Sequence, residues 1–323
     1  MIKKEKQLPV KIQKLQALLR RLLQNHIIRA KIEEEYAKSM AGYRGEQSID
    51  YHLLPLSSKE FLVLHDIRLL NKEHYFQLDI VILTRSYILI LEVKNMSGTL
   101  CFDQTFKQLI RTLNGREEAF PDPILQVRRQ QKNLQTWLSE HNYPSMPLHS
   151  YIVISNPAAI LKTIPNYSET VLKKVLHAGS LQDKIRLLDN RYKDQILTIK
   201  DLNKLSRQLI KHHSPNNPDL LQQFQLSRSD LITGVHCTQC FSIPMKKISG
   251  SWVCKKCMFT SKEAYIASLN DYALLLGPTI TNKEIRQFLR ISSMSSASKL
   301  LTVLNLHHTG SYKNRKYQLP ILK

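Results

Sequence analysis

Two charged residues stand at the end of an apolar run, residues 87–94, where charges are normally excluded. Successive side chains of a strand point to opposite faces, so Glu92 and Lys94 share one face and Val93 points away. A carboxylate beside hydrocarbon is costly unless it is paired or binds a metal ion. Because Asp79 offers a second carboxylate one predicted strand earlier, the pattern predicts a divalent metal site with a lysine beside it.

Four cysteines form a second group with metal chemistry. Cys237 and Cys240 make one Cys-x-x-Cys pair, Cys254 and Cys257 make another, and thirteen residues separate the pairs. Two such turns can surround one tetrahedral Zn²⁺ with four thiolates at about 2.3 Å, which leaves no open position for chemistry. The spacing predicts a structural zinc ribbon whose folding is coupled to metal binding. The alternatives, a redox pair or disulfides, lack a βαβ setting and an oxidising compartment.

The charge of the chain predicts a polyanionic partner. Its 323 residues include 47 lysines and arginines against 26 acids, a formal net charge of +21. Nucleic acid is the first candidate, because neutralising phosphates releases counterions, and a membrane surface is the second. No apolar stretch reaches the roughly 18 residues of a spanning helix, and the N-terminus shows no uncharged signal core. We therefore expect a cytoplasmic protein that does not enter the membrane.

The periodicity of apolar residues predicts the elements that position these groups. Leucines and isoleucines at helical spacing predict one helix over residues 8–40, ended by Gly42. This helix is interpreted as packing on a core; a coiled-coil arm or a membrane-surface helix are the alternatives. Beyond it, β-rich runs and one good helix predict an α/β (α+β) arrangement. The predicted strands are 50–56, 76–83, 87–94 and 148–154, and the predicted helix is 123–141.

Several short motifs follow one another in residues 41–157. They are Gly45-Glu46, Gln77-Leu-Asp79, Glu92-Val-Lys94-Asn95 with Gly98 close behind, Asp122-Pro123, and Gln126 at the start of the predicted helix. In this order they resemble the nuclease-related domain family, NERD, of the PD-(D/E)XK nuclease superfamily. Leu78 departs mildly from the family pattern, in which this position is often Ile.

The resemblance implies a nuclease-like core with a mixed sheet and the acids at one edge. It implies that Asp79 and Glu92, helped by Glu46 and the Val93 carbonyl, hold Mg²⁺ or Mn²⁺. Lys94 would orient the attacking water or stabilise developing negative charge, and Gln126 would position water or phosphate. The alternative is an inactive nuclease-like fold. There Asp79 and Lys94 form a structural salt bridge, Glu46 is a helix N-terminal acid, and Gln126 is a helix-start residue.

The C-terminal residues predict a helix-turn-helix with a basic wing. A capping box at residues 281–284 begins one helix, and residues 295–304 form a second helix after a turn. Residues 309–319 are expected to form a hairpin or wing. The alternative is a small helical bundle with a cationic tail. The residues expected to contact DNA are Ser295, Ser296, Ser298 and Lys299 in the major groove and Lys313, Arg315 and Lys316 at phosphates or the minor groove.

These observations predict five segments: an N-terminal helix (1–40), a nuclease-like domain (41–157), a helical region and linker (158–230), a zinc ribbon (231–260), and a winged-helix-like module (261–323). The favoured function is a metal-dependent endonuclease or DNA-processing enzyme, positioned on DNA by the ribbon and the helix-turn-helix. A non-catalytic DNA-binding or regulatory protein with an inactive nuclease scaffold is the alternative. RNA is the weaker candidate for the nucleic acid.

Overall fold

The computed structural model describes residues 2–56, 60–164, 167–311 and 314–320. The chain folds into two compact units, and each is described by itself. The first unit contains residues 1–7 and 40–215, and the second contains residues 8–39 and 216–323. The N-terminal 39 residues are therefore divided between the two units.

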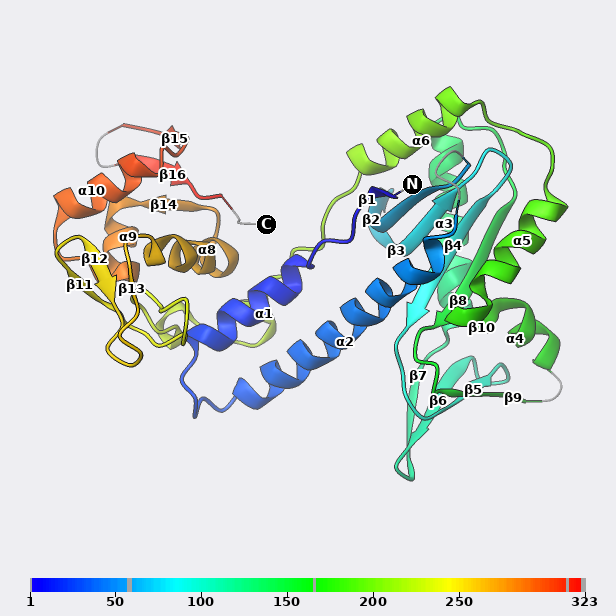
Figure 1. The fold of residues 1–323 in the computed structure, drawn as a ribbon, viewed down its shortest axis with the longest axis horizontal. Helices are drawn as coiled ribbons and strands as arrows, with labels where there is room; N and C mark the ends of the chain where they lie inside the picture. Colours follow the sequence, from blue (N-terminus) through cyan, green and yellow to red (C-terminus); the bar gives the residue numbers. More distant parts are fainter. Residues whose placement is uncertain (1, 57–59, 165–166, 312–313, 321–323) are drawn as a thin grey trace. The chain divides into compact units, whose positions relative to one another are not determined.

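A six-stranded mixed sheet forms the centre of the first unit (Figure 1). Its order is β1-β2-β3-β4-β8-β10, in which β2, β3 and β4 are antiparallel neighbours, while β1 pairs with β2, and β8 with both β4 and β10, in parallel. Their bounds are Ile2–Lys4 (β1), Leu62–Asn71 (β2), His74–Leu83 (β3), Ile88–Lys94 (β4), Leu148–Ile154 (β8) and Val175–His177 (β10).

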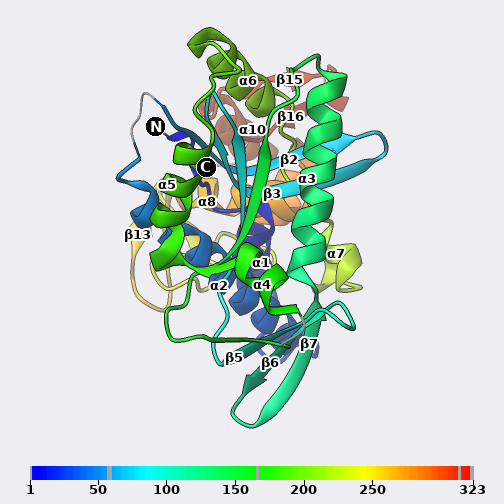
Figure 2. The same ribbon diagram turned by 90° about the vertical axis from the view of Figure 1, so that its right-hand side faces the viewer.

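Helices cover both faces of this sheet, because alternate residues of its strands are buried on opposite sides. Ile88 and Ile90 of β4 pack with α3 (Pro123–Glu140) and α6 (Ile199–Lys211). Leu89 and Leu91 pack on the other face, with the end of α2 (Arg29–Leu53) and with α5 (Leu181–Arg191). Figure 2 shows α3 and α5 on opposite sides of the strands. A strand buried on both faces accounts for the continuous apolar run of β4.

A smaller sheet in the same unit has the order β7-β6-β5-β9. Its core residues Leu100, Phe102 and Leu109 pack against Ile124 and Val127 at the start of α3. The sheet therefore supports the end of α3 that faces the charged residues of β4. The remaining elements of this unit are β5 (Thr99–Asp103), β6 (Gln108–Leu113), β7 (Arg116–Pro121), β9 (Ile160–Thr163), α4 (Ser168–Lys174) and the 3₁₀ turn Ala178–Ser180.

Most of the predicted strands are confirmed, but the N-terminal elements differ from the prediction. The single helix expected over residues 8–40 is two helices, α1 (Val10–Arg21) and α2 (Arg29–Leu53). Helix α2 continues through Gly42 and Gly45, so the strand predicted at residues 50–56 is wrong. A glycine inside a helix costs only about 1 kcal/mol relative to alanine, and packing of Ile49 and Leu53 on the sheet favours the continued helix.

The second unit joins α1 and the start of α2 to the C-terminal elements. A three-stranded sheet, β11-β12-β13, lies beside the cysteine pairs in the sequence: Cys237 and Cys240 precede β11, and Cys254 and Cys257 lie between β12 and β13. A second three-stranded sheet has the order β14-β16-β15. The capping box at Thr281 and Glu284 and the predicted C-terminal helices are confirmed. The bounds are α7 (Leu220–Gln223), the 3₁₀ turn Arg228–Asp230, β11 (Lys246–Ile248), β12 (Ser251–Val253), β13 (Thr260–Ser261), α8 (Ala264–Leu276), β14 (Thr279–Thr281), α9 (Asn282–Leu289), α10 (Met294–Val303), β15 (His308–Thr309) and β16 (Lys316–Gln318).

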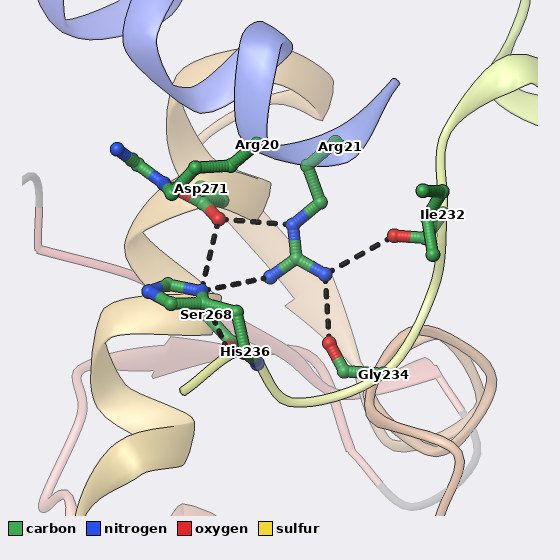
Figure 3. Close-up of polar contacts among 7 residues, drawn as sticks. All are labelled: Arg20, Arg21, Ile232, Gly234, His236, Ser268 and Asp271. Atoms are coloured by element: carbon green, nitrogen blue, oxygen red, sulfur yellow. Dashed lines mark hydrogen bonds and ion pairs between the residues drawn. The ribbon is translucent and has the colours of Figure 1, made fainter. Parts of the chain in front are cut away.

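A buried ionic network fixes α1 to α8 within this unit (Figure 3). The Arg21 guanidinium donates to Asp271 Oδ2 at 2.9 Å and to the carbonyls of Ile232 and Gly234, and Arg20 donates to Asp271 Oδ1 at 2.6 Å. Both Arg21 and Asp271 are fully buried. Burial alone would raise the pKa of Asp271, but His236 and the two arginines hold it below its usual range. The amphipathic helix thus packs on a core, as predicted.

His236, Ser268 and Asp271 are the residue types of a nucleophilic triad, but their geometry is structural. Ser268 Oγ and Asp271 Oδ2 lie 3.1 and 3.2 Å from the same ring atom, His236 Nδ1, so His236 does not relay between them. All three side chains are also buried. A triad needs its base to contact nucleophile and orienting acid through different nitrogens.

Among the described helices, none is long and apolar enough to cross a bilayer.

Candidate functional site

The last residues of β4 bring three predicted site residues into direct contact. Glu92 and Lys94 point to the face covered by α3, and Lys94 Nζ donates to Glu92 Oε1 at 2.7 Å. Gln126 on α3 joins both groups: its Nε2 donates to Glu92 Oε1 at 2.7 Å, and its Oε1 accepts from Lys94 Nζ at 3.1 Å. Glu92 is buried, whereas Lys94 and Gln126 are partly exposed. An acid, a base and an amide are therefore held together at a point that solvent reaches.

The start of α3 determines where Gln126 lies. Asp122 caps the helix by accepting a hydrogen bond from the Ile124 amide at 2.9 Å, and Pro123 occupies the first turn, where its missing N–H has no cost. Residues four apart lie on one helix face, so Gln130 follows Gln126 toward the sheet. Gln130 Nε2 donates to Glu92 Oε2 at 2.7 Å and to the Gln77 carbonyl at 3.0 Å.

Asp79 approaches the same strand from β3. Its Oδ2 accepts a hydrogen bond of 2.9 Å from the Val93 amide, between the two charged residues of β4. Burial and the neighbouring Glu92 carboxylate raise the pKa of Asp79 to about 7, although the Val93 amide and two lysines oppose this. Two carboxylates that repel one another in a partly buried setting fit a divalent cation, which prefers oxygen ligands. Asp79 and Glu92 are the residues that would hold it.

Glu46 lies on α2 next to Gly45, which allows the helix to lie against Asn95 at the end of β4. A Cβ atom added to Gly45 would be 2.3 Å from Asn95 Cβ, closer than any side chain permits. Asn95 in turn donates to the Ala41 carbonyl at 2.8 Å. The Glu46 carboxylate makes an ion pair with Lys6, a residue whose side chain is 3% exposed. Among the described residues, no three carboxylates bring their oxygens within 4.8 Å of one another.

The prediction from sequence missed two residues of this site, Gln130 and Lys6. For Gln130 a signal exists, since a second glutamine four residues after Gln126 repeats the same helix face. For Lys6 there is no local signal, because it reaches Glu46 through the pairing of β1 with β2.

The four cysteines lie together in the second unit, with their sulfur atoms within 4.8 Å of one another. The Sγ atoms of Cys237 and Cys257 are 3.6 Å apart, and those of Cys240 and Cys254 are 3.5 Å apart. A disulfide requires about 2.05 Å, whereas four thiolates at about 2.3 Å from a tetrahedral ion lie somewhat under 4 Å apart. The donor set and spacing fit one Zn²⁺.

The two cysteine turns have matching backbones, which supports this interpretation. Each pair is followed by a residue with positive φ, Phe241 at 58° and Met258 at 57°. The Phe241 amide donates to the Cys237 carbonyl, and the Met258 amide donates to the Cys254 carbonyl. Each turn therefore closes around its own pair.

The residues expected to contact DNA lie on α10 and β16. Ser295, Ser298 and Lys299 are exposed on α10, Ser296 is partly buried, and Arg315 and Lys316 are exposed near or on β16. Ser298 accepts a hydrogen bond from Asn282 Nδ2 at 3.0 Å, so α9 fixes its hydroxyl. Lys313 lies outside the described residues.

Comparisons with known proteins assign the segment that contains the first site. Residues 41–155 match the family model described as nuclease-related domain (NERD). A solved structure, protein VC1899 from Vibrio cholerae, matches at 11% identity and a TM-score of 0.26 over 53% of this chain and 37% of that chain. The chain thus spans less than two fifths of that protein, and a likeness this low assigns nothing further. No curated protein matches the sequence.

Proposed function

From a chain that contains a nuclease-related domain, we propose a metal-dependent nuclease that hydrolyses phosphodiester bonds of DNA. The observation that carries the proposal is the contact of Glu92, Lys94 and Gln126 at the end of β4, with Asp79 bonded to the strand between them. These groups come from two neighbouring strands and one helix. A structural salt bridge alone would need neither the second carboxylate nor the amide.

Each residue has a role that follows from its chemistry. A divalent cation held by Asp79 and Glu92 would polarise a phosphodiester oxygen and lower the pKa of the attacking water. Lys94 carries a positive charge 2.7 Å from Glu92 and is directed by Gln126, so it would stabilise negative charge that develops on the phosphate. Gln130 holds the second oxygen of Glu92 and fixes the orientation of that carboxylate.

We infer that the second unit holds the nucleic acid. Residues 231–323 contain thirteen lysines and arginines against three acids, a net charge of +10 and nearly half of the excess of the whole chain. The order α8, β14, α9, α10, β15, β16, with β16 between the other two strands, resembles that of winged-helix domains and supports this proposal. In such domains the second helix of the helix-turn-helix, here α10, enters the major groove. The Zn²⁺ is structural in this proposal.

Cleavage of plasmid and branched DNA with Mg²⁺ or Mn²⁺ tests the catalytic proposal. Asp79→Asn and Lys94→Met should each lower the rate by about 100-fold or more, because each removes a group that contacts the reacting phosphate or its cation. Glu73→Gln and Lys72→Met are matched controls, since both residues are exposed in the turn between β2 and β3 and should leave the rate unchanged. Full activity in the Asp79 and Lys94 variants would refute the assignment.

DNA binding is tested separately by its salt dependence. Replacing Arg315 and Lys316 together by glutamine should reduce the slope of log affinity against log salt by about 2, because each phosphate contact contributes about 0.9. An unchanged slope would show that Arg315 and Lys316 do not contact the phosphate backbone. Competition between matched DNA and RNA decides which nucleic acid the protein prefers.

A non-catalytic DNA-binding protein is the second candidate, and one observation favours it. Glu92 is already stabilised without a cation: Oε1 accepts hydrogen bonds from Lys94 and Gln126, and Oε2 accepts one from Gln130, so three of the roughly four acceptor positions of the carboxylate are occupied. This candidate predicts salt-dependent DNA binding with no turnover in any divalent metal. The same cleavage assay separates the two.

A further inference from the structure

We propose that Lys6, which precedes the nuclease-related segment, is a positioning residue of its site: the Lys6 ammonium engages Glu46 and takes the place of a second divalent cation. The site then holds one divalent ion, at Asp79 and Glu92, and Glu46 serves as the partner of Lys6. This inference rests on the proposed metal-dependent function.

The contacts of Lys6 are those of a fixed cation. Its side chain is 3% exposed, and its ammonium makes an ion pair with the Glu46 carboxylate, whose side chain is 22% exposed. The same ammonium lies 5.5 Å from the centre of the Tyr43 ring. Tyr43 and Glu46 are three residues apart on α2, so one helix face supplies both contacts. The Lys6 ammonium is therefore held at this position, and ions from solvent do not freely replace it.

The pairing of the N-terminal strand β1 positions Lys6 at the site. Strand β1 pairs in parallel with β2, with Ile2 opposite Val63 and Lys4 opposite Leu64. Lys4 Nζ adds hydrogen bonds to the carbonyls of His65 at 2.8 Å and Asp66 at 2.9 Å. These bonds anchor the segment two residues before Lys6. The position of Lys6 is thus built by the fold of the first unit and does not depend on a flexible tail.

The charge of the site matches one divalent ion when Lys6 is included. Burial lowers the pKa of Lys6, and the charges of the Asp79, Asp66 and Asp50 carboxylates oppose this effect. Among the described residues, the charged groups that pair with Lys6 or Glu92 or act electrostatically on Lys6 or Asp79 include five carboxylates and three ammonium groups, a net charge of −2 when all are ionised, which one divalent cation neutralises. These groups are Glu46, Asp50, Asp66, Asp79 and Glu92 with Lys4, Lys6 and Lys94.

A second ion would overcompensate the charge of the site. Two ions would leave the site at +2 beside buried apolar residues, and uncompensated charge is costly there. Removing Lys6 frees Glu46 and takes the net charge to −3, which a single ion no longer balances.

Counting bound Mn²⁺ tests the inference on the full-length, zinc-containing protein. Mn²⁺ prefers oxygen ligands and does not compete for four thiolates. Ions that disappear in the Asp79→Asn variant are assigned to the site. We expect one such ion in the natural protein, two in Lys6→Gln, and one in Lys6→Arg, which keeps the charge. Lys3→Gln is the matched control, because Lys3 is exposed on β1, three residues before Lys6.

A second comparison does not depend on whether the Lys6→Gln variant folds. The double variant Lys6→Gln, Glu46→Gln replaces the ion pair by a neutral pair, a change that folds usually tolerate. If Glu46 serves Lys6, the double variant keeps one ion with affinity within threefold of the natural protein, whereas Glu46→Gln alone binds at least tenfold more weakly because Lys6 is left unpaired. If Glu46 is a metal ligand, the double variant stays as weak as the single one.

The outcomes separate this inference from the proposed function. One ion in both the natural protein and Lys6→Gln, with cleavage intact, overturns the role of Lys6 and leaves the nuclease proposal standing. Two ions in the natural protein also overturn it. No Asp79-dependent ion in any variant refutes the metal-dependent function and this inference together.

Discussion

Gln130 Nε2 donates a 2.7 Å hydrogen bond to Glu92 Oε2, which leaves Oε1 for Lys94 and Gln126. The carboxylate plane is therefore fixed from α3, by a side chain that is itself buried. Removing a hydrogen bond to a charged group costs about 1.5–3 kcal/mol, so Gln130→Leu should lower DNA cleavage by roughly 10- to 100-fold. The variant should change kcat more than KM, because Glu92 turns while the DNA contacts remain. Gln135→Leu, exposed on the same helix, is the control and should be neutral.

The two glycines of α2 should respond in opposite ways to alanine. Gly45→Ala places a Cβ 2.3 Å from Asn95 Cβ, and overpacking of this kind costs about 1–3 kcal/mol. Gly42 has no atom within 4 Å of an added Cβ, so Gly42→Ala should stabilise the helix by about 0.5–1 kcal/mol. Thermal unfolding of the two variants measures both effects. If the two variants change the thermal stability equally, α2 does not approach β4 through Gly45.

Acid should destabilise the first unit through His65. Burial and the charges of Lys6 and Lys4 lower the pKa of His65 to about 4. Between about pH 6.5 and pH 4 the unfolded chain then binds a proton that the folded state does not, so the free energy of unfolding falls as the pH falls. For a side chain with no exposed area the loss is about 3 kcal/mol.

Urea unfolding at pH 7 and pH 4.5 measures this effect of His65. His65→Phe should remove most of the acid-dependent loss, because the apolar ring takes up no proton. The exposed His74, replaced by glutamine, should leave the loss unchanged. If the free energy of unfolding falls by the same amount between pH 7 and pH 4.5 in all three proteins, His65 is not the group responsible.

Removal of zinc should unfold the three-stranded sheet β11-β12-β13. Metal binding supplies the folding energy of small Cys₄ modules, so a chelator or Cys254→Ser should release the ion and expose Trp252, which is buried on β12. Zinc content measured by atomic absorption should fall from one per chain to none. Cys101→Ser should keep the ion, since Cys101 lies on β5 in the first unit. Retention of zinc by the Cys254 variant would exclude the four-thiolate site.

The Arg21–Asp271 pair should be costly to break from one side. Arg21→Met leaves the Asp271 carboxylate buried with only Arg20 and His236, and loss of one partner of a buried pair costs about 3–5 kcal/mol. Arg20→Met should cost less, because the Arg20 side chain is 22% exposed and Arg21 keeps its contact. Hydrogen exchange of α1 and α8 amides reports the difference. Similar exchange in both variants would refute the role of Arg21 as the main anchor.

Local patterns were sufficient to predict the elements that carry the chemistry. The apolar run of β4, the cap and stripe of α3, and the two cysteine turns each depend on residues within about twenty positions of one another. The nuclease-related segment predicted at residues 41–157 agrees with the family match at residues 41–155. Patterns of this range are visible in a sequence because propensity, periodicity and ligand spacing are local properties.

The errors arose where long-range packing decided the structure. Gly42 predicts the end of a helix, yet α2 continues to Leu53 because the sheet buries its apolar face and Gly45 allows a close approach to Asn95. The local cost of glycine in a helix is smaller than the free energy gained by that packing. A sequence alone does not show which of the two is larger.

Patterns of neighbouring residues are enough to locate the acid and lysine of β4, the capped helix with its glutamine, the four-cysteine set and the basic charge. Folding of distant segments onto one another is needed to bring Lys6 to Glu46, Gln130 to Glu92 and Arg21 to Asp271. The last of these pairs is separated by 250 positions. Residues so distant meet only when strands have paired and helices have docked, and no periodicity within the chain encodes that event.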